Sequence, residues 1–524
     1  MNHATPAAFY AHQESRNAYY DIGLEMIESN FDYFAGGALL APTGEDEKQE
    51  DLYSLSEKAG YKVVKTQKEA EALTPEDGKV IVVDEHFVQF LLTSALKKHL
   101  HFCLKKMERS SSLYVVDPKR NFTRKRKHLF ANTMMNVLLF GSGSLKDELY
   151  KLFGYTPDTP SASSFIQARD KIRPDAFRTL FDLFNSRTHR SFLFNEYRLL
   201  AVDGSVLPIS NMLQDEDTTI QEANQTDMPF SAYHINTSYD LLEHTYEDVV
   251  LQGQAKMNEN GAFNMMIERY KGSKAIFIAD RGYESINSFV KIQKANQKYL
   301  IRVKDIHSRT SVLRSFGPFE DKEFDIHVKR ILTTKQTKEV RTHPEIYKFV
   351  PKNQRFEYFD ENDRFEFSFR VVRFKIDDDT YESIATNLDE GEFPLEKIKE
   401  LYHLRWNIET AYRDVKYDLD LNTLHSRKRN LIQQEIYSKL LLYNFCRRVT
   451  GEIKIQKKNR KHEYQLNYVR AYHIIRRFLK EKSKKTPSYV ESMIAKEILP
   501  VRRNRHHKRK VKTKSLVSFN YRYD

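Results

Sequence analysis

The sequence lacks the residues that mark secreted, zinc-ribbon and membrane proteins. Its 524 residues include only two cysteines, Cys103 and Cys446. This excludes a disulfide framework and a zinc site of paired thiolates, and it favours a reducing compartment. The longest apolar stretch, Phe87 to Leu96, is too short to cross a bilayer, and the N-terminus has no signal-peptide pattern. We therefore expect a soluble, cytoplasmic protein with no membrane partner.

Negative charge is the scarcer sign in this chain. Lysine and arginine number 85 against 72 aspartates and glutamates, so the formal net charge is +13. A basic balance suits a polyanionic partner, although ribosomal and membrane-surface proteins share it. A hydrophobic content of 40% in so long a chain predicts several domains rather than one core.

The first dense run of positive charge, Lys119 to His128, precedes two or three amphipathic helices between Leu129 and Asn185. This pattern favours a small helical DNA-binding domain. Ser161 or Ser163 could cap a helix within it. That helix would expose Gln167, Arg169 and Lys171 to DNA, or it is an ordinary surface helix with solvated charges.

Two apolar runs each end in an aspartate. The apolar run in YRLLAVDGS ends at Asp203, and the apolar run in KAIFIADRGY ends at Asp280. Both runs predict buried strands. Phe230 to Asp240 and Tyr246 to Gly253 predict two further strands between them, and a short helix is expected from Asn264 to Lys271. The segment therefore predicts a mixed sheet with an aspartate at two strand ends, where open α/β sheets place their chemistry.

Alternating residues from Tyr299 to about Asp379 predict an inserted β-rich subdomain, most clearly in RFEFSFRVVRFKID. After a strand at Ser383 to Asn387, Pro394 is expected to begin a long helix that continues through Lys416.

The long helix carries four polar residues on one stripe. Tyr402, Arg405, Glu409 and Lys416 fall within an arc of about 60° at the angular spacing of an α-helix. This stripe is either a solvated face with an Arg405 to Glu409 ion pair or part of a site with the two strand-end aspartates. Three carboxylates that meet repel one another unless divalent cations neutralise them.

Oxygen ligands of this type favour Mg²⁺, with Mn²⁺ as the alternative. Two such ions about 4 Å apart can activate a water or a 3′-hydroxyl group and stabilise the leaving oxygen in phosphodiester transfer. Arg405 and Lys416 would then hold DNA phosphates beside the metal ions.

With the spacing Y-x2-R-x3-E-x6-K and the two aspartates before it, the chain from about Asp117 to Asn444 resembles the DDE transposases of bacterial insertion sequences. The resemblance implies an RNase H-like α/β fold, a mixed sheet flanked by helices with a β-rich insertion before the third acidic residue. It implies that Asp203, Asp280 and Glu409 are the catalytic metal ligands.

The same resemblance implies that Tyr402, Arg405 and Lys416 contact DNA phosphate near the transposon end. It also implies double-stranded DNA with terminal inverted repeats as partner and a homodimer on paired ends. Some relatives cut through a hairpin and stack a flipped base on a tryptophan of the insertion. The only tryptophan here is Trp406, which lies in the signature helix, so that role is not transferred. We expect Trp406 to pack against the core, with a DNA-facing position as the alternative.

The N-terminal segment HATPAAFYAHQESR, continued by FDYFAGG and GYKVVKTQKEAEAL, resembles a different family, the bacterial alkaline phosphatases. In that family, the residues that match His3 and Thr5 belong to a magnesium site, and the residue that matches Arg16 is an arginine that binds the substrate phosphate. The nucleophilic serine segment and the zinc ligands of that family are missing. We therefore expect a gene fragment without phosphatase activity, joined to a transposase by insertion or by gene calling.

These observations predict seven segments, of which the last is a helical C-terminus. Its basic run, Arg502 to Lys514, is expected to be a solvated tail that can also contact DNA. A non-catalytic DNA-binding relic and an RNase H-like nuclease without strand transfer are the alternatives to an active transposase. The expected boundaries are 1–86 for the phosphatase-like fragment, 87–116 for a junction, 117–195 for the helical DNA-binding domain, 196–300 and 383–450 for the catalytic domain, 301–382 for the insertion and 451–524 for the basic region.

Overall fold

The computed structural model divides the chain into two units, Met1–Phe102 with Val449–His506, and Cys103–Arg448 with His507–Asp524. Among the described residues, none of the helices combines the length and apolar composition that crossing a bilayer requires. The structure describes residues 12–13, 18–29, 31–36, 39, 41–44, 48–65, 69, 73–83, 85–124, 128–188, 192–210, 215–220, 230–377, 380–453, 455, 462–481 and 490–501.

The first unit contains a small parallel sheet in the order β1-β3-β2 and an antiparallel pair, β14 with β15. Ile22, Met26 and Ile81 belong to the core that the helices α1 and α2 form with the parallel sheet. The pair β14 and β15 corrects the expectation of a wholly helical C-terminus. The phosphatase-like residues His3, Thr5 and Arg16 and the run from 502 to 514 lie outside the described residues. The elements are α1 (Tyr19–Glu28), β1 (Tyr33–Gly36), α2 (Leu52–Lys58), β2 (Tyr61–Val64), β3 (Lys79–Val83), α4 (Glu85–Arg109), which continues into the second unit, β14 (Glu463–Leu466), α15 (Tyr468–Lys480), α16 (Val490–Lys496) and β15 (Ile498–Val501).

The second unit begins with four helices, α5 (Phe130–Leu138), α6 (Leu145–Phe153), α7 (Ala162–Arg169) and α8 (Pro174–Thr188). Ser161 caps α7, because its side chain accepts a hydrogen bond from the Ser164 amide. Gln167 is exposed. The expectation that Arg169 also faces outward is wrong, since Arg169 is fully buried and its Nη2 lies 2.9 Å from Glu435 Oε1 of helix α14 (Arg429–Thr450).

A ten-stranded mixed sheet follows in this unit, in the order β11-β10-β12-β13-β9-β8-β4-β6-β5, with β7 also paired to β6. The β-rich insertion continues the central sheet, because β12 pairs with β13 and β13 pairs with β9. The strands are β4 (Arg198–Ile209), β5 (Thr219–Ile220), β6 (Phe230–Asp240), β7 (Thr245–Gly253), β8 (Ala275–Ala279), β9 (Lys298–Val303), β10 (Phe324–Thr333), β11 (Tyr347–Phe349), β12 (Arg364–Asp377) and β13 (Thr380–Thr386).

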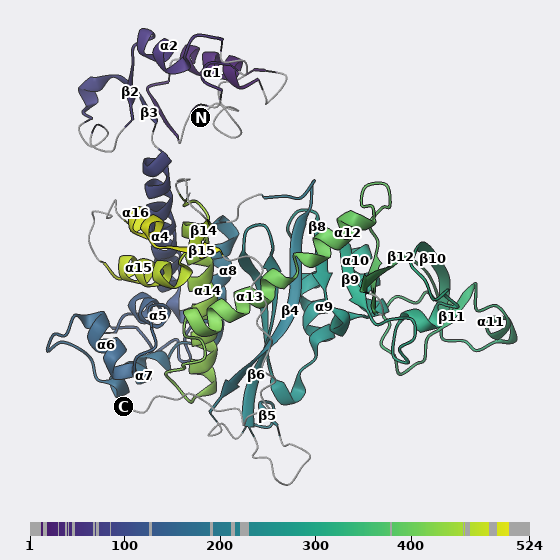
Figure 1. Ribbon diagram of the computed structural model, residues 1–524. Helices are drawn as coiled ribbons and strands as arrows, with labels where there is room; N and C mark the ends of the chain where they lie inside the picture. Colours follow the sequence, from purple (N-terminus) through teal and green to yellow (C-terminus); the bar gives the residue numbers. More distant parts are fainter. Residues whose placement is uncertain are drawn as a thin grey trace. The chain divides into compact units, whose positions relative to one another are not determined.

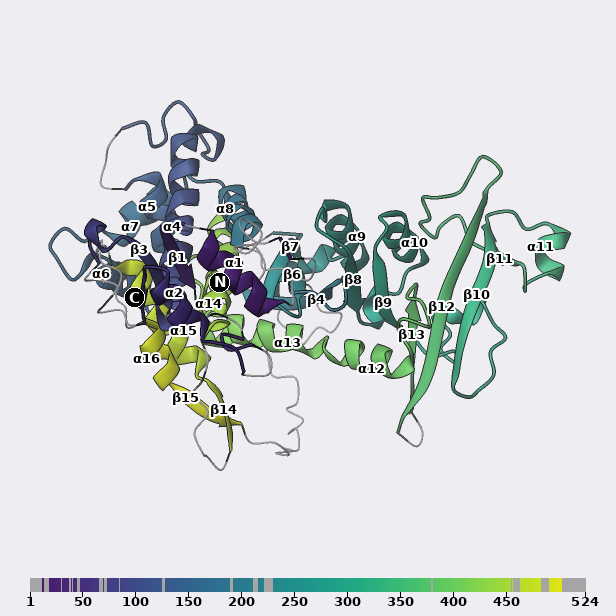
Figure 2. The same cartoon turned by 90° about the horizontal axis from the view of Figure 1, so that it is seen from above.

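Helices flank the strands β4, β8 and β9 on both faces. Figure 2 shows α9 (Glu259–Arg269) and α10 (Ile286–Lys294) on one face, and α12 (Leu395–His403) and α13 (Trp406–Arg413) on the other. All five residues of β8 are buried, as its apolar composition predicts for a strand covered on both faces. A short helix, α11 (Lys338–Thr342), lies in the insertion.

The expectation of one uninterrupted helix after Pro394 is wrong in two places. Leu404 and Arg405 separate α12 from α13, although both keep right-handed helical dihedrals, and Figure 1 shows the two helices following each other along nearly one line. A π-helical turn, Asp414–Asp418, then ends the element. Because hydrogen bonds in a π turn span five residues, the α-helical arc calculated above does not extend to Lys416.

A buried ionic cluster joins α7 to α14. The Glu435 carboxylate accepts hydrogen bonds from the backbone N–H of His425 at 2.9 Å and lies 3.1 Å from its ring Nδ1. Burial by itself would raise the pKa of Glu435, but the charges of Arg169 and His425 and the hydrogen bonds from His425 lower it to about 2. The Glu435 carboxyl group is therefore ionised at neutral pH.

We expect Glu435→Gln to reduce the free energy of unfolding by about 3 to 5 kcal/mol, because it leaves Arg169 buried without its counter-charge. In the wild type, this contribution is complete above the ordinary pKa of 4.5 and is lost as the pH falls toward 2. Denaturant unfolding at several pH values measures both effects. The exposed Glu390→Gln is the control, and equal stability of the two variants at pH 7 would contradict the prediction.

Candidate active site

The two aspartates lie next to each other because β4 and β8 are neighbouring parallel strands. Val202 of β4 is in register with Ala279 of β8, where this pairing ends. The next residues are Asp203 and Asp280, and adjacent strands lie about 4.8 Å apart. One correction concerns β4, which does not end at Asp203 but continues to Ile209 in antiparallel pairing with β6.

Local hydrogen bonds hold both carboxyl groups. Asp203 Oδ1 accepts from the Gly204 amide at 2.9 Å. Asp280 is the N-cap of a single 3₁₀ turn, η5 (Arg281–Tyr283), and its Oδ1 accepts from the Gly282 amide at 2.8 Å. Both side chains are therefore oriented by the backbone that follows them.

Tyr412 attaches the helix of Glu409 to the same part of the sheet. Its buried hydroxyl group lies 2.9 Å from the backbone oxygens of Asp203 and Ile235 and 2.8 Å from Thr237 Oγ1. Since Glu409 precedes Tyr412 by one helical turn on α13, this anchor brings Glu409 to the strand that carries Asp203.

Arg405 and Glu409 form the ion pair that the i, i+4 spacing predicts, with Arg405 Nη2 at 2.9 Å from Glu409 Oε1. The Arg405 guanidinium group is nearly buried and stacks 4.9 Å from the centre of the Trp406 ring. Trp406 itself is 52% exposed. The expectation that Trp406 packs against the core is therefore wrong, because its ring covers Arg405 from the solvent side.

The two remaining signature residues differ in their surroundings. Tyr402 is buried, and its hydroxyl group has no hydrogen-bond partner among the described residues. Lys416 Nζ donates to Ser205 Oγ and to the Val206 carbonyl, each at 2.7 Å. Burial lowers the pKa of Lys416 to about 8, against the opposing effect of Asp203. Lys416 therefore lies beside β4 just beyond Asp203.

Negative charge is concentrated at the strand ends. Burial raises the pKa of the Asp203 carboxyl group to about 7. The carboxylates of Asp280 and Glu409 contribute to this increase, whereas the hydrogen bond from the Gly204 amide and the charge of Arg405 oppose it. Asp280 and Glu409 therefore both lie near Asp203.

The donor chemistry of this cluster suits a hard divalent cation, since it consists of carboxylate oxygens that repel one another. As the side chains stand, no group of three or more His, Cys, Asp or Glu within the described part of the chain is arranged to hold a metal ion. Glu409 is directed to Arg405 instead. A shared ion would require Glu409 to leave that partner.

A further carboxylate, Glu259, lies at the same strand ends and was missed from the sequence. A Cβ at Gly204 would be 3.0 Å from Glu259 Oε1, and a Cβ at Gly282 would be 3.2 Å from Glu259 Oε2 and 3.1 Å from Asp280 Oδ1. Glu259 therefore lies close to the backbone that follows both aspartates. The buried His234 contacts it, with Nε2 at 3.1 Å from Oε1.

The N-cap of α9 was the signal that could have identified Glu259. Asn258 accepts a hydrogen bond from the Gly261 amide and begins α9. The sequence analysis predicts this helix only from Asn264 to Lys271, so Glu259 falls outside it, whereas α9 begins at Glu259.

Comparison with known families identifies the segment that carries this cluster. The model of the transposase DDE domain matches residues 194–445. This segment is a transposase DDE domain. Asp203, Asp280, Glu409 and the newly found Glu259 all lie inside it.

Two transposases show weak sequence similarity to the chain. The transposase InsG for insertion sequence element IS4 of Escherichia coli (strain K12) is 22% identical over 293 residues, which cover 54% of this chain and 60% of InsG. The probable transposase for insertion sequence element IS5377 of Geobacillus stearothermophilus is 22% identical over 192 residues, 36% of this chain and 43% of that protein. The chain thus spans about half the length of these relatives.

Among solved structures, the piggyBac transposase synaptic complex with hairpin DNA aligns with a TM-score of 0.40 and 10% identity, covering 78% of this chain and 84% of that one.

The DDE domain begins shortly before β4 and ends within α14, so it contains the whole ten-stranded sheet.

We expect Asp203→Asn to make the metal-free protein more stable at pH 8. The raised pKa means that burying the Asp203 carboxylate costs stability as the pH increases from about 4 to about 7, and asparagine has the same shape without the charge. Thermal unfolding in EDTA measures this effect, and the gain should shrink toward pH 4. A variant that is less stable than the wild type at pH 8 would show that the crowding of negative charge is not a cost to the fold.

Proposed function

We propose that this protein is a transposase that cuts DNA at the ends of an insertion sequence and joins those ends to new DNA. Asp203, Asp280 and Glu409 would hold two Mg²⁺ ions, or Mn²⁺ as the alternative. The segment boundaries given above and an RNase H-like core are part of this proposal.

One observation carries the proposal. The register of β4 with β8 brings Asp203 and Asp280 together, and Tyr412 attaches the helix of Glu409 to the same strand, inside a segment that matches the transposase DDE domain. Two aspartates where the parallel pairing of β4 with β8 ends, followed in the chain by a glutamate on a helix attached to β4, suit metal-dependent phosphodiester chemistry.

Each residue of the cluster has a role in this scheme. Bound metal ions would supply a polarised water or 3′-hydroxyl nucleophile and charge stabilisation for the leaving oxygen. Arg405, released from Glu409 and stacked on the Trp406 ring, would hold a DNA phosphate by its fork. Lys416 would act as a point charge beside β4. Tyr402 would orient Arg405, since the guanidinium carbon of Arg405 lies 5.8 Å from the centre of the Tyr402 ring. Tyr402 would also contact phosphate if the site opens.

The partners follow from the same scheme. We propose double-stranded DNA with terminal inverted repeats as substrate, a homodimer on paired ends, and action in the cytoplasm on bacterial DNA. Residues 1–86 would be an alkaline-phosphatase-like fragment without phosphatase activity. Inverted repeats enclosing the codons after about 87, with phosphatase codons resuming beyond the far repeat, would establish that origin.

We expect Asp280→Asn and Glu409→Gln to reduce DNA cutting by a factor on the order of 10³, because a lost metal ligand removes several kcal/mol of transition-state stabilisation. DNA binding should be nearly unchanged, since the basic surfaces stay intact. The measurement is cleavage by the full chain, with Mg²⁺, of duplexes that carry the DNA bordering the coding sequence. Glu400→Gln, an exposed carboxylate of the neighbouring α12, is the control.

The pattern of cuts separates the alternatives. Cuts at the repeat boundary followed by joining to a second duplex support a transposase. Random nicking indicates an RNase H-like nuclease without strand transfer, and binding without cutting indicates a non-catalytic relic. Normal cutting by either variant would remove that residue from the proposed metal site.

A further inference from the structure

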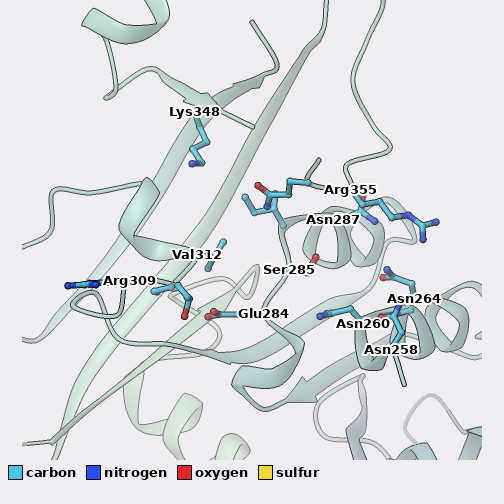
Figure 3. A pocket seen from close by; sticks show the side chains of 15 residues that line it. Asn258, Asn260, Asn264, Glu284, Ser285, Asn287, Arg309, Val312, Lys348 and Arg355 are labelled. Carbon is cyan, nitrogen blue, oxygen red and sulfur yellow. The ribbon is translucent and has the colours of Figure 1, made fainter. Parts of the chain in front are cut away.

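A polar cavity of about 460 Å³ lies beside the strand ends, between the helices α9 and α10 and the β-rich insertion. Its volume is in the range of small-molecule sites. Figure 3 shows side chains reaching it from both sides: Asn260, Asn264 and Asn287 from the two helices and Lys348 from the insertion. Asn260 of the lining donates to the carbonyl of Gly282, two residues after Asp280, at 3.4 Å, so the cavity adjoins the cluster described above.

Two helices direct their N-termini to this cavity. Asn258 and Gly261 from the beginning of α9, and Ser285 and Ile286 from the beginning of α10, are among its lining residues. Ser285 is the N-cap of α10 but makes no side-chain capping hydrogen bond. The terminus of α9 is already satisfied, because Asn258 accepts a hydrogen bond from the Gly261 amide and Glu259 places a carboxylate in the first turn. The first amide groups of a helix and its dipole favour an anion, and the uncapped terminus of α10 is therefore the one available to a ligand.

Asn287 provides an independent sign of a missing acceptor. Its side chain is only 3% exposed. Oδ1 accepts a hydrogen bond from the Glu357 amide at 3.1 Å, whereas the amide nitrogen Nδ2 has no partner among the described residues. A buried N–H donor without a partner costs free energy, which a ligand with acceptor oxygens would recover.

Positive side chains dominate the charge around the cavity. Lys348 is half-buried, forms no ion pair among the described residues, and burial lowers its pKa. Arg309 and Arg355 are exposed at the rim, and Arg355 pairs with Glu357 at 2.5 Å. Glu284 is the only carboxylate among the described lining residues, and Lys304 neutralises it at 2.9 Å.

We propose that this cavity binds a phosphate group through Lys348, the Nδ2 of Asn287 and the N-terminus of α10. A phosphate offers several acceptor oxygens to donors that converge from different elements. The identity of the phosphate rests on the proposed function: it belongs to a DNA strand whose backbone passes the end of β8. The cavity then positions that strand relative to Asp280. A free phosphate or nucleotide has the same chemistry, and the two sources are separated below.

The first test is titration of inorganic phosphate into the full chain by calorimetry, in EDTA and at constant ionic strength. Asn287→Asp keeps the acceptor for the Glu357 amide and replaces the unpartnered donor by a negative oxygen. An acidic residue in the first turn of a helix is favourable, so α10 should form. We expect Asn287→Asp and Lys348→Gln each to weaken phosphate binding by about tenfold or more. Lys338→Gln, an exposed lysine of α11 in the same insertion, should bind like the wild type.

The second test identifies the source of the phosphate. Binding of a duplex that carries the DNA bordering the coding sequence is measured by fluorescence anisotropy, without divalent cations, over a series of salt concentrations. If a DNA phosphate occupies the cavity, Lys348→Gln should reduce the slope of log K against log salt by about 0.9 relative to Lys338→Gln. Loss of phosphate binding with an unchanged slope would assign the site to a free phosphate or nucleotide.

Absence of phosphate binding by the wild type, or equal binding by all the variants, would overturn the proposed site. That result would leave the proposed transposase function untouched, because the cutting assay with Asp280→Asn does not involve this cavity. Conversely, a chain that binds phosphate here but never cuts DNA would retain the site and lose the function.

Discussion

The parallel pairing of β4 with β8 is the constraint on which the candidate site depends. Because Val202 is aligned with Ala279, the next residue in each segment is an aspartate, and the strand pairing alone brings the backbones of Asp203 and Asp280 side by side. A slip of one residue would turn Asp203 to the opposite face of the sheet. Tyr412 adds the third element by bonding α13 to the backbone of Asp203 itself.

This arrangement places like charges in a half-buried position and compensates them only in part. Arg405 pairs with Glu409 and also lowers the pKa of Asp203. Lys416 donates its hydrogen bonds to Ser205 and Val206 rather than to a carboxylate. A fold selected for stability alone would not keep so many acidic groups here. The excess is understandable if cations and DNA complete the charge balance, and the phosphate-binding cavity beside β8 would extend the positive surface that such a strand meets.

Local signals in the sequence predicted the strands and the helix cap correctly. The apolar runs before Asp203 and Asp280 are strands, and Ser161 caps α7, since burial on both faces and capping leave patterns within a few residues. Arg169 could not be assigned in this way. Its burial depends on Glu435, which is distant in the chain, and no local pattern distinguishes a buried ion pair from a solvated charge.

The site shows the same division. The spacing of Arg405 and Glu409 predicts their pairing, but the break at Leu404 and the π turn depend on tertiary packing and change where Trp406 and Lys416 lie. Glu259 reaches the site only because α9 follows β7 and crosses the sheet beside β8. Its position required the topology, which one sequence does not provide.

The convergence of Asp203, Asp280 and Glu409 on shared cations is the central claim, and anomalous scattering from crystals of the full chain soaked in Mn²⁺ tests it most directly. The expected result is an anomalous peak between the carboxylates of Asp203 and Asp280, with Glu409 turned from Arg405 toward the metal. Manganese elsewhere in the molecule, with Glu409 still paired to Arg405, would contradict it.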